Sequence, residues 1–81
     1  MSKIDWIAAK EILDRAYKKA LQETELNKKL VPKSSEYKKS LEKNLRKYAE
    51  AEKTDLKKYG NETVTEFERF LEIYVKEEIA K

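Results

Sequence analysis

Apolar residues in the middle of the chain recur at steps of three and four, and this spacing limits the fold more than any other feature. Between residues 35 and 59 they share one side of a helix that turns by about 100° per residue. They are Tyr37, Leu41, Leu45, Tyr48, Ala49, Leu56 and Tyr59. Basic side chains recur on the opposite side, at Lys39, Lys43, Arg46, Lys53 and Lys57. The spacing predicts one long amphipathic helix over 35–59, with one side for a core and a basic side for solvent or an anion.

A first helix is predicted over about residues 3–29. Its apolar stripe is Trp6, Ala9, Leu13, Ala16, Tyr17, Ala20 and Leu21. Further along, the register slips, so that Leu26 and Leu30 fall off this stripe. The helix therefore either bends near Glu23 or continues and offers both leucines to a different neighbour.

Residue types that cap helices mark where the first two helices begin. Ser2 and Asp5 are alternative caps for the first helix, and Ser34 and Ser35 are alternatives for the second. Pro32 lies between the two helices, and its ring removes a backbone donor and disfavours helical geometry before it. A short loop is expected there.

The third helix is predicted over 64–79. Gly60 is placed to adopt the left-handed conformation that ends helices, and Thr63 with Glu66 matches the capping box of a helix start. The apolar stripe of this helix is Val64, Phe67, Phe70, Leu71, Tyr74 and Val75.

Together these patterns predict an all-α fold in one domain, residues 1–81: a three-helix bundle or array. Because the loops are short, successive helices are expected to be antiparallel neighbours. The third helix is shorter than the other two. Part of the long pair is therefore expected to project beyond it and to leave apolar surface for a partner.

Composition argues against several classes of function. The 81 residues include no histidine, no cysteine and one glycine, and 43% of them are charged, mostly Lys and Glu. Histidine is the commonest general base and metal ligand, and phosphate-binding loops need several glycines. No apolar run approaches the roughly 20 residues that cross a membrane, and no signal sequence is recognisable. We expect a soluble, cytoplasmic, non-enzymatic protein without cofactor or metal, and the Lys/Glu enrichment is typical of hyperthermophiles.

The predicted third helix has apolar residues over a wider arc than one core stripe needs. Phe70 and Ile73 lie on one edge of that arc, and Glu66 and Glu77 flank them. An apolar pair with charged neighbours is typical of a protein interface. We therefore predict a protein-binding surface there, for a larger protein or a second copy of the chain. The alternative is that a bent first helix covers the pair with its last two leucines.

Charge is distributed unevenly along the chain. Residues 1–34 and 35–60 each carry eight bases and five acids, whereas residues 61–81 carry three bases and six acids. The basic side of the central helix therefore suggests, as an alternative function, contact with DNA phosphates. Such contact would be independent of sequence, because only Asn44 and Arg46 are of the types that read base edges.

In size, Lys/Glu content and helical pattern, the chain resembles small accessory proteins of thermophilic archaea and their viruses. Within that group it resembles the small helical subunits of crenarchaeal B-family DNA polymerases. The resemblance rests on the three apolar stripes and the basic side of the central helix. It implies a non-catalytic subunit that docks on a larger enzyme in DNA replication, and no individual residue's role carries over. The leading hypothesis is such an accessory subunit, and the alternative is the DNA-binding protein.

Overall fold

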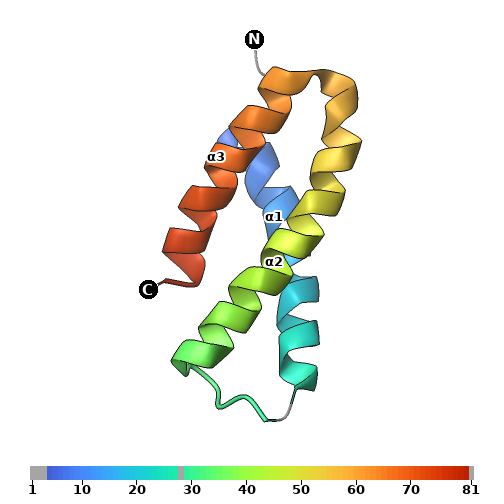
Figure 1. Ribbon diagram of the computed structural model, residues 1–81. Helices are drawn as coiled ribbons and strands as arrows, with labels where there is room; N and C mark the ends of the chain where they lie inside the picture. The colour runs from blue at the N-terminus through green and yellow to red at the C-terminus, as the bar shows by residue number, and fades with distance from the viewer. Residues whose placement is uncertain (1–3, 28, 81) are drawn as a thin grey trace.

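The computed structural model describes residues 4–27 and 29–80. These residues form three α-helices and a short 3₁₀ turn, which are α1 Trp6–Leu26, α2 Ser35–Leu56, η1 Lys57–Tyr59 and α3 Asn61–Glu78. Successive helices run antiparallel, so α1 and α3 run in the same direction (Figure 1). The all-α prediction of a three-helix bundle is confirmed.

Polar side chains fix the ends of α1 and the start of α2. The Asp5 carboxylate accepts a hydrogen bond of 2.8 Å from the Ala8 backbone N–H, so α1 begins at Trp6. At the other end, Asn27 is extended and its side chain accepts from the Lys29 N–H at 3.2 Å. This local bond ends α1 earlier than the predicted residue 29. The Ser34 hydroxyl accepts from the N–H of Tyr37 at the start of α2. Residues 3 and 28 of the predicted helix, and the alternative cap Ser2, lie outside the described residues.

The predicted start of the third helix at residue 64, with Thr63 as its cap, is wrong. Gly60 has φ +102° and ψ 164°, a conformation that L side chains rarely adopt, and it lets the chain reverse within one residue. α3 therefore begins at Asn61. Thr63 lies inside the first turn, where it is buried and its hydroxyl donates to the Tyr59 carbonyl at 3.3 Å. Gly60 has the positive φ that was predicted, but its ψ is extended instead of left-handed helical.

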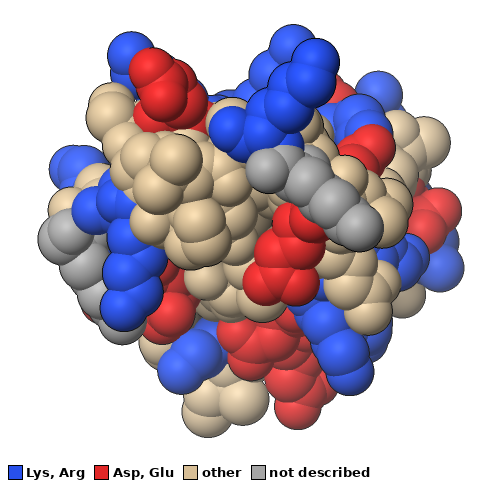
Figure 2. Space-filling view, turned by 90° about the horizontal axis from the view of Figure 1, so that it is seen from below, with Lys and Arg blue, Asp and Glu red and all other residues tan. Residues whose placement is uncertain are grey.

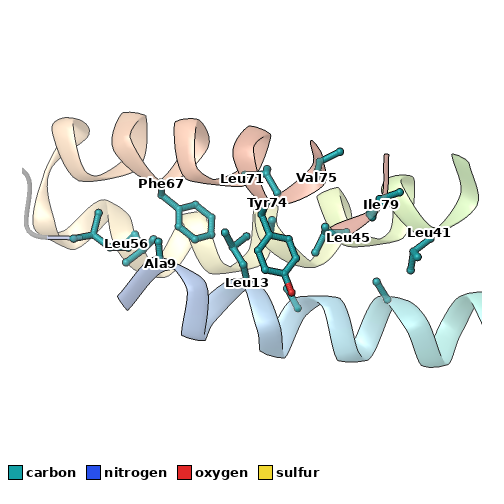
Figure 3. Close-up of a cluster of buried hydrophobic side chains, with 14 residues drawn as sticks. Ala9, Leu13, Leu41, Leu45, Leu56, Phe67, Leu71, Tyr74, Val75 and Ile79 are labelled. Carbon is teal, nitrogen blue, oxygen red and sulfur yellow. The ribbon is translucent and has the colours of Figure 1, made fainter. Parts of the chain in front are cut away.

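The core is a continuous apolar column along the bundle axis. Figure 3 shows it running from Ala9, Leu56 and Phe67 at one end to Leu41 and Ile79 at the other. Phe67, Leu13 and Leu45 have no exposed surface. Burying side chains of this size contributes about 1.5–3 kcal/mol each. The three predicted stripes therefore supply most of the core, which also includes Ile4 and Ile79. Tyr59 of the second stripe is half exposed, because η1 winds more tightly than an α-helix and rotates this residue off the stripe.

Two polar contacts across the core fix how the helices pair. The Tyr74 hydroxyl of α3 donates to the Asp14 carboxylate of α1 at 2.7 Å. The Asn44 side chain of α2 donates to the Thr24 hydroxyl of α1 at 2.8 Å, and that hydroxyl donates to the Ala20 carbonyl. A buried polar group left without a partner is costly, so these bonds favour one register over its neighbours.

The helices differ in length, and the difference shapes one end of the molecule. α3 has 18 residues, whereas α1 and α2 have 21 and 22. Figure 1 shows α3 ending part-way along the bundle while α1 and α2 continue to the loop that joins them. The principal extents are 43 × 21 × 16 Å. The projecting helix pair predicted from the sequence is confirmed.

Candidate protein-binding surface

The predicted binding pair of α3 separates into a half-buried residue and an exposed one. Phe70 packs against Trp6 of α1, with ring centroids 5.5 Å apart and planes inclined at 56°. Ile73, one turn further along α3, keeps 45% of its surface exposed. Phe70 therefore closes the seam between α1 and α3, and Ile73 lies outside it.

The alternative cover for this pair is wrong. α1 is one continuous helix through Glu23 to Leu26, and Leu26 is 80% exposed. Leu30 lines a hollow with Thr24 and Tyr37 at the loop end of the bundle. Neither leucine covers Ile73.

Ile7, the neighbour of Trp6 in sequence, is a further exposed apolar residue at the start of α1 that sequence reasoning did not select. Ile7 follows Trp6 directly and is 72% exposed. Among the large hydrophobic residues described on α1, Leu26 alone is more exposed. Its helical position, about 100° from Trp6 and outside the apolar stripe, was the signal for Ile7 in the sequence. We call Trp6, Ile7, Phe70 and Ile73 the seam patch.

The predicted acidic rim contains charges of both signs. Glu66 lies 3.6 Å from the guanidinium of Arg69, which is itself largely exposed. Glu77 is exposed on the same side of α3. Lys76 and Arg69 also lie one turn or less from Ile73 in the helix. Two carboxylates therefore flank the apolar pair, but Arg69 already partly neutralises the charge of Glu66.

The structure divides the predicted basic face of α2 into two groups. Arg46 makes a bidentate contact with Glu72 of α3, at 2.6 and 3.1 Å, and lies 3.5 Å from Glu42. These hydrogen bonds lower the pKa of the Glu72 carboxyl and raise the pKa of Arg46. Lys53 contacts Glu50 at 2.6 Å and Glu68 of α3 at 3.0 Å. Arg46 and Lys53 therefore hold α3 against α2 instead of facing solvent together.

The other three bases of that face do point outward. Lys39, Lys43 and Lys57 are exposed, and none forms an ion pair with a residue that the structure describes. Lys43 and Lys57 are fourteen positions apart in the sequence, which corresponds to roughly 21 Å along a helix. The continuous basic stripe expected from the periodicity is therefore reduced to one adjacent pair and a distant third lysine.

A groove lies beyond the end of α3, between the projecting parts of α1 and α2. It has a volume of about 390 Å³, and its apolar walls are Tyr17, Leu21, Pro32, Tyr37, Leu41 and Ile79. Burial raises the pKa of the Tyr17 hydroxyl, and Glu78 raises it further. Burial and Glu25 act in the same way on the pKa of Tyr37. Sequence reasoning predicted apolar surface at this end but did not identify these residues.

Within residues 4–27 and 29–80, no helix is long and apolar enough to span a membrane, and no three carboxylates are grouped as a metal site would require. No protein-family model, curated protein or solved structure matches this chain. The resemblance to archaeal accessory subunits accordingly stays a prediction.

Proposed function

We propose that this protein is a non-catalytic accessory subunit that binds a larger protein through the seam patch. The observation that carries this proposal is the exposure of Ile73, at 45%, beside a half-buried aromatic pair. Neither Leu26 nor Leu30 covers this isoleucine, and it stays exposed among residues 4–27 and 29–80. A cytoplasmic setting and a DNA-replication complex such as a polymerase, both expected from the sequence, are part of the proposal.

The patch has the composition of an interface centre. Aromatic residues are enriched at protein interfaces, and the residues that dominate affinity are clustered and surrounded by polar neighbours. Trp6 and Phe70 are held in place by each other, so binding would order few side chains. Ile7 and Ile73 add apolar area on either helix.

The charge of α3 indicates the chemistry of the partner. Residues 61–78 carry six glutamates and two bases, a net charge of −4. Glu68 and Glu72 contact bases of α2, whereas Glu77 is exposed next to the patch. The proposed partner is therefore a protein with an apolar docking surface and basic side chains at its rim.

The test compares two variants that add the same charge to α3. Ile73→Lys places a lysine in the patch, and Thr65→Lys places one at an exposed position away from it. Both proteins and the wild type are immobilised and exposed to extract of the source cells, and each captured protein is then purified and titrated by calorimetry. We expect a protein that binds wild type and Thr65→Lys alike and binds Ile73→Lys at least about tenfold more weakly, a loss of about 1.4 kcal/mol.

The contrary result would be a set of captured proteins that bind all three immobilised forms equally. Loss of binding in both variants would point to charge on α3 as a whole instead of the patch. Either result would remove the seam patch as the docking surface.

A second candidate function is sequence-independent DNA binding, favoured by the exposed lysines Lys39, Lys43 and Lys57. Residues 1–60 carry sixteen bases and ten acids, so the α1–α2 hairpin has a net charge of +6. Such a surface would contact phosphates and release counterions, which makes its affinity fall steeply with salt.

The DNA-binding candidate has its own test, in which Arg46 is left unchanged because it holds α3. Simultaneous replacement of Lys39, Lys43 and Lys57 by Glu should abolish binding to a mixed-sequence duplex at about 50 mM salt without unfolding the protein. Wild-type protein that does not bind the duplex under those conditions would exclude this function.

A further inference from the structure

The groove beyond α3 occupies the place that α3 itself would fill if it were longer. Tyr17, Leu21 and Glu25 lie on one wall at successive turns of α1, and Tyr37 and Leu41 lie on the other wall. An adjoining hollow shares Lys33, Lys38 and Ile79 with the groove and adds Lys39. Figure 2 shows this end of the molecule, where uncharged surface gathers near the centre and charged side chains of both signs surround it.

The bases of α2 form a series that runs toward this groove. Lys53, Arg46 and Lys39 are seven residues apart, which is close to two helical turns, so they lie on nearly the same side of α2. Lys53 contacts Glu68 at 3.0 Å, and Arg46 contacts Glu72 at 2.6 Å. Lys39 lies where α3 ends, next to Ile79 and Ala80, and it has no acidic partner among the described residues. The series therefore has a third position that α3 does not reach.

From this arrangement we propose that the groove binds a short, acidic, amphipathic helix of a partner protein. Its apolar side contacts Leu21, Tyr37 and Leu41, and one of its carboxylates contacts Lys39. The proposal does not rest on the seam patch, because that patch lies between Trp6 and Phe70, away from this groove.

The geometry of the walls favours a helix as the occupant. Two antiparallel helices leave a groove along their axes, and a third helix fills such a groove with residues spaced by three and four. The wall from Tyr17 to Glu25 covers nine residues of α1, whose eight steps span about 12 Å. An occupant of about eight residues, two helical turns, fits that length.

The charges of α2 favour an acidic occupant. α3 satisfies the same requirements along the rest of the bundle, with apolar residues toward the core and glutamates toward Arg46 and Lys53. The occupant repeats this pattern one step further along α2. Lys33 and Lys38 line both hollows, whereas Glu25 and Glu78 line the groove and Glu42 lines the adjoining hollow. These charges offset one another, so the preference for an acidic flank rests on the place of Lys39 in the series with Arg46 and Lys53. Glu25 on the opposite wall favours a basic residue on the other flank of the occupant.

The test uses two synthetic twelve-residue peptides with blocked ends. Both carry leucines at spacings of three and four; the acidic peptide has glutamates along one flank, and the basic peptide has lysines there. Each is titrated into ¹⁵N-labelled protein and followed by backbone amide shifts. We expect the acidic peptide to bind more tightly and to shift the amides of Leu21, Tyr37 and Leu41, while the amides of α3 before Tyr74 stay in place.

Charge reversal at Lys39 is the decisive variant. Lys39→Glu should weaken the acidic peptide about tenfold, because an attractive contact is replaced by a repulsive one, and should strengthen the basic peptide. Lys43→Glu is the matched control, since Lys43 is exposed one turn away and lines neither hollow. It should leave both affinities within about twofold, because distant exposed charges are screened by salt.

Several results would overturn the proposal. Equal affinity of the two peptides, shifts confined to another surface, or equal effects of Lys39→Glu and Lys43→Glu would each show that Lys39 does not select the occupant. Concentration-dependent dimerisation of the peptide-free protein in sedimentation equilibrium, with the same three amides shifting, would show that a second copy fills the groove.

Discussion

Replacing Leu45 with alanine tests the core where the three helices meet. Leu45 has no exposed surface, and the substitution removes three carbon atoms from the apolar column. Their transfer to water accounts for about 2.4 kcal/mol, at about 0.8 kcal/mol per carbon. The cavity left behind adds roughly 24 cal/mol for each Å³ that does not collapse. The expected loss in unfolding free energy is therefore about 3–4 kcal/mol. This is a large part of the total unfolding free energy of such a domain, which is about 5–15 kcal/mol.

The assay is urea unfolding followed by far-ultraviolet circular dichroism. A loss of about 3–4 kcal/mol corresponds to a Tm about 12–32 °C lower, since each kcal/mol shifts the Tm of so small a domain by about 4–8 °C. Leu71→Ala should have a similar effect, because Leu71 is 6% exposed. Ile73→Ala is the control and should stay within about 0.5 kcal/mol of wild type. A loss below about 1 kcal/mol for Leu45→Ala would refute the core assignment, since buried leucines cost about 2–5 kcal/mol.

Other predictions concern the polar contacts between the helices. Tyr74→Phe removes the 2.7 Å hydrogen bond to Asp14 and should cost about 1 kcal/mol in urea unfolding, because Asp14 is exposed and regains water; an unchanged midpoint would contradict the contact. Burial and the Asp14 carboxylate raise the pKa of Tyr74 in the folded state. The neutral Tyr74 hydroxyl therefore stabilises the folded state fully below the unfolded pKa of about 10, and this stabilisation is lost as the pH rises further. Above about pH 10 the unfolding free energy should fall less steeply with pH in Tyr74→Phe than in wild type. A double-mutant cycle with Arg46→Ala and Glu72→Ala should give a coupling energy of no more than about 1 kcal/mol, because the two side chains are 40% and 56% exposed. A coupling energy above about 2 kcal/mol would show that solvent does not weaken this ion pair as expected.

Helical periodicity predicted the fold well because the core depends on it directly. The stripes through Leu13, Leu45 and Phe67 are set by steps of three and four, and these residues are fully buried. Helix ends depend on single backbone conformations that periodicity does not report. The positive φ of Gly60 starts α3 three residues before the predicted position, and Asn27 ends α1 by bonding to the next turn of the chain.

The candidate sites were harder to predict because they depend on contacts between helices. Periodicity placed Arg46 and Lys53 on the same side as Lys43, but nothing in α2 indicates that glutamates of α3 reach the first two. The same limit applies to the seam patch: the wide apolar arc of α3 was visible, whereas the packing of Phe70 on Trp6 and the exposure of Ile73 follow from how α1 and α3 meet.

Ile73 of α3 is exposed, and we propose that a partner protein binds it. The most direct measurement is the unfolding free energy of Ile73→Lys, determined on the same sample whose affinity for the captured partner is titrated. We expect stability within about 0.5 kcal/mol of wild type, as for other exposed positions, together with loss of binding. A stability loss of about 2 kcal/mol or more, with binding retained by the folded fraction, would place Ile73 in the core and the docking surface elsewhere.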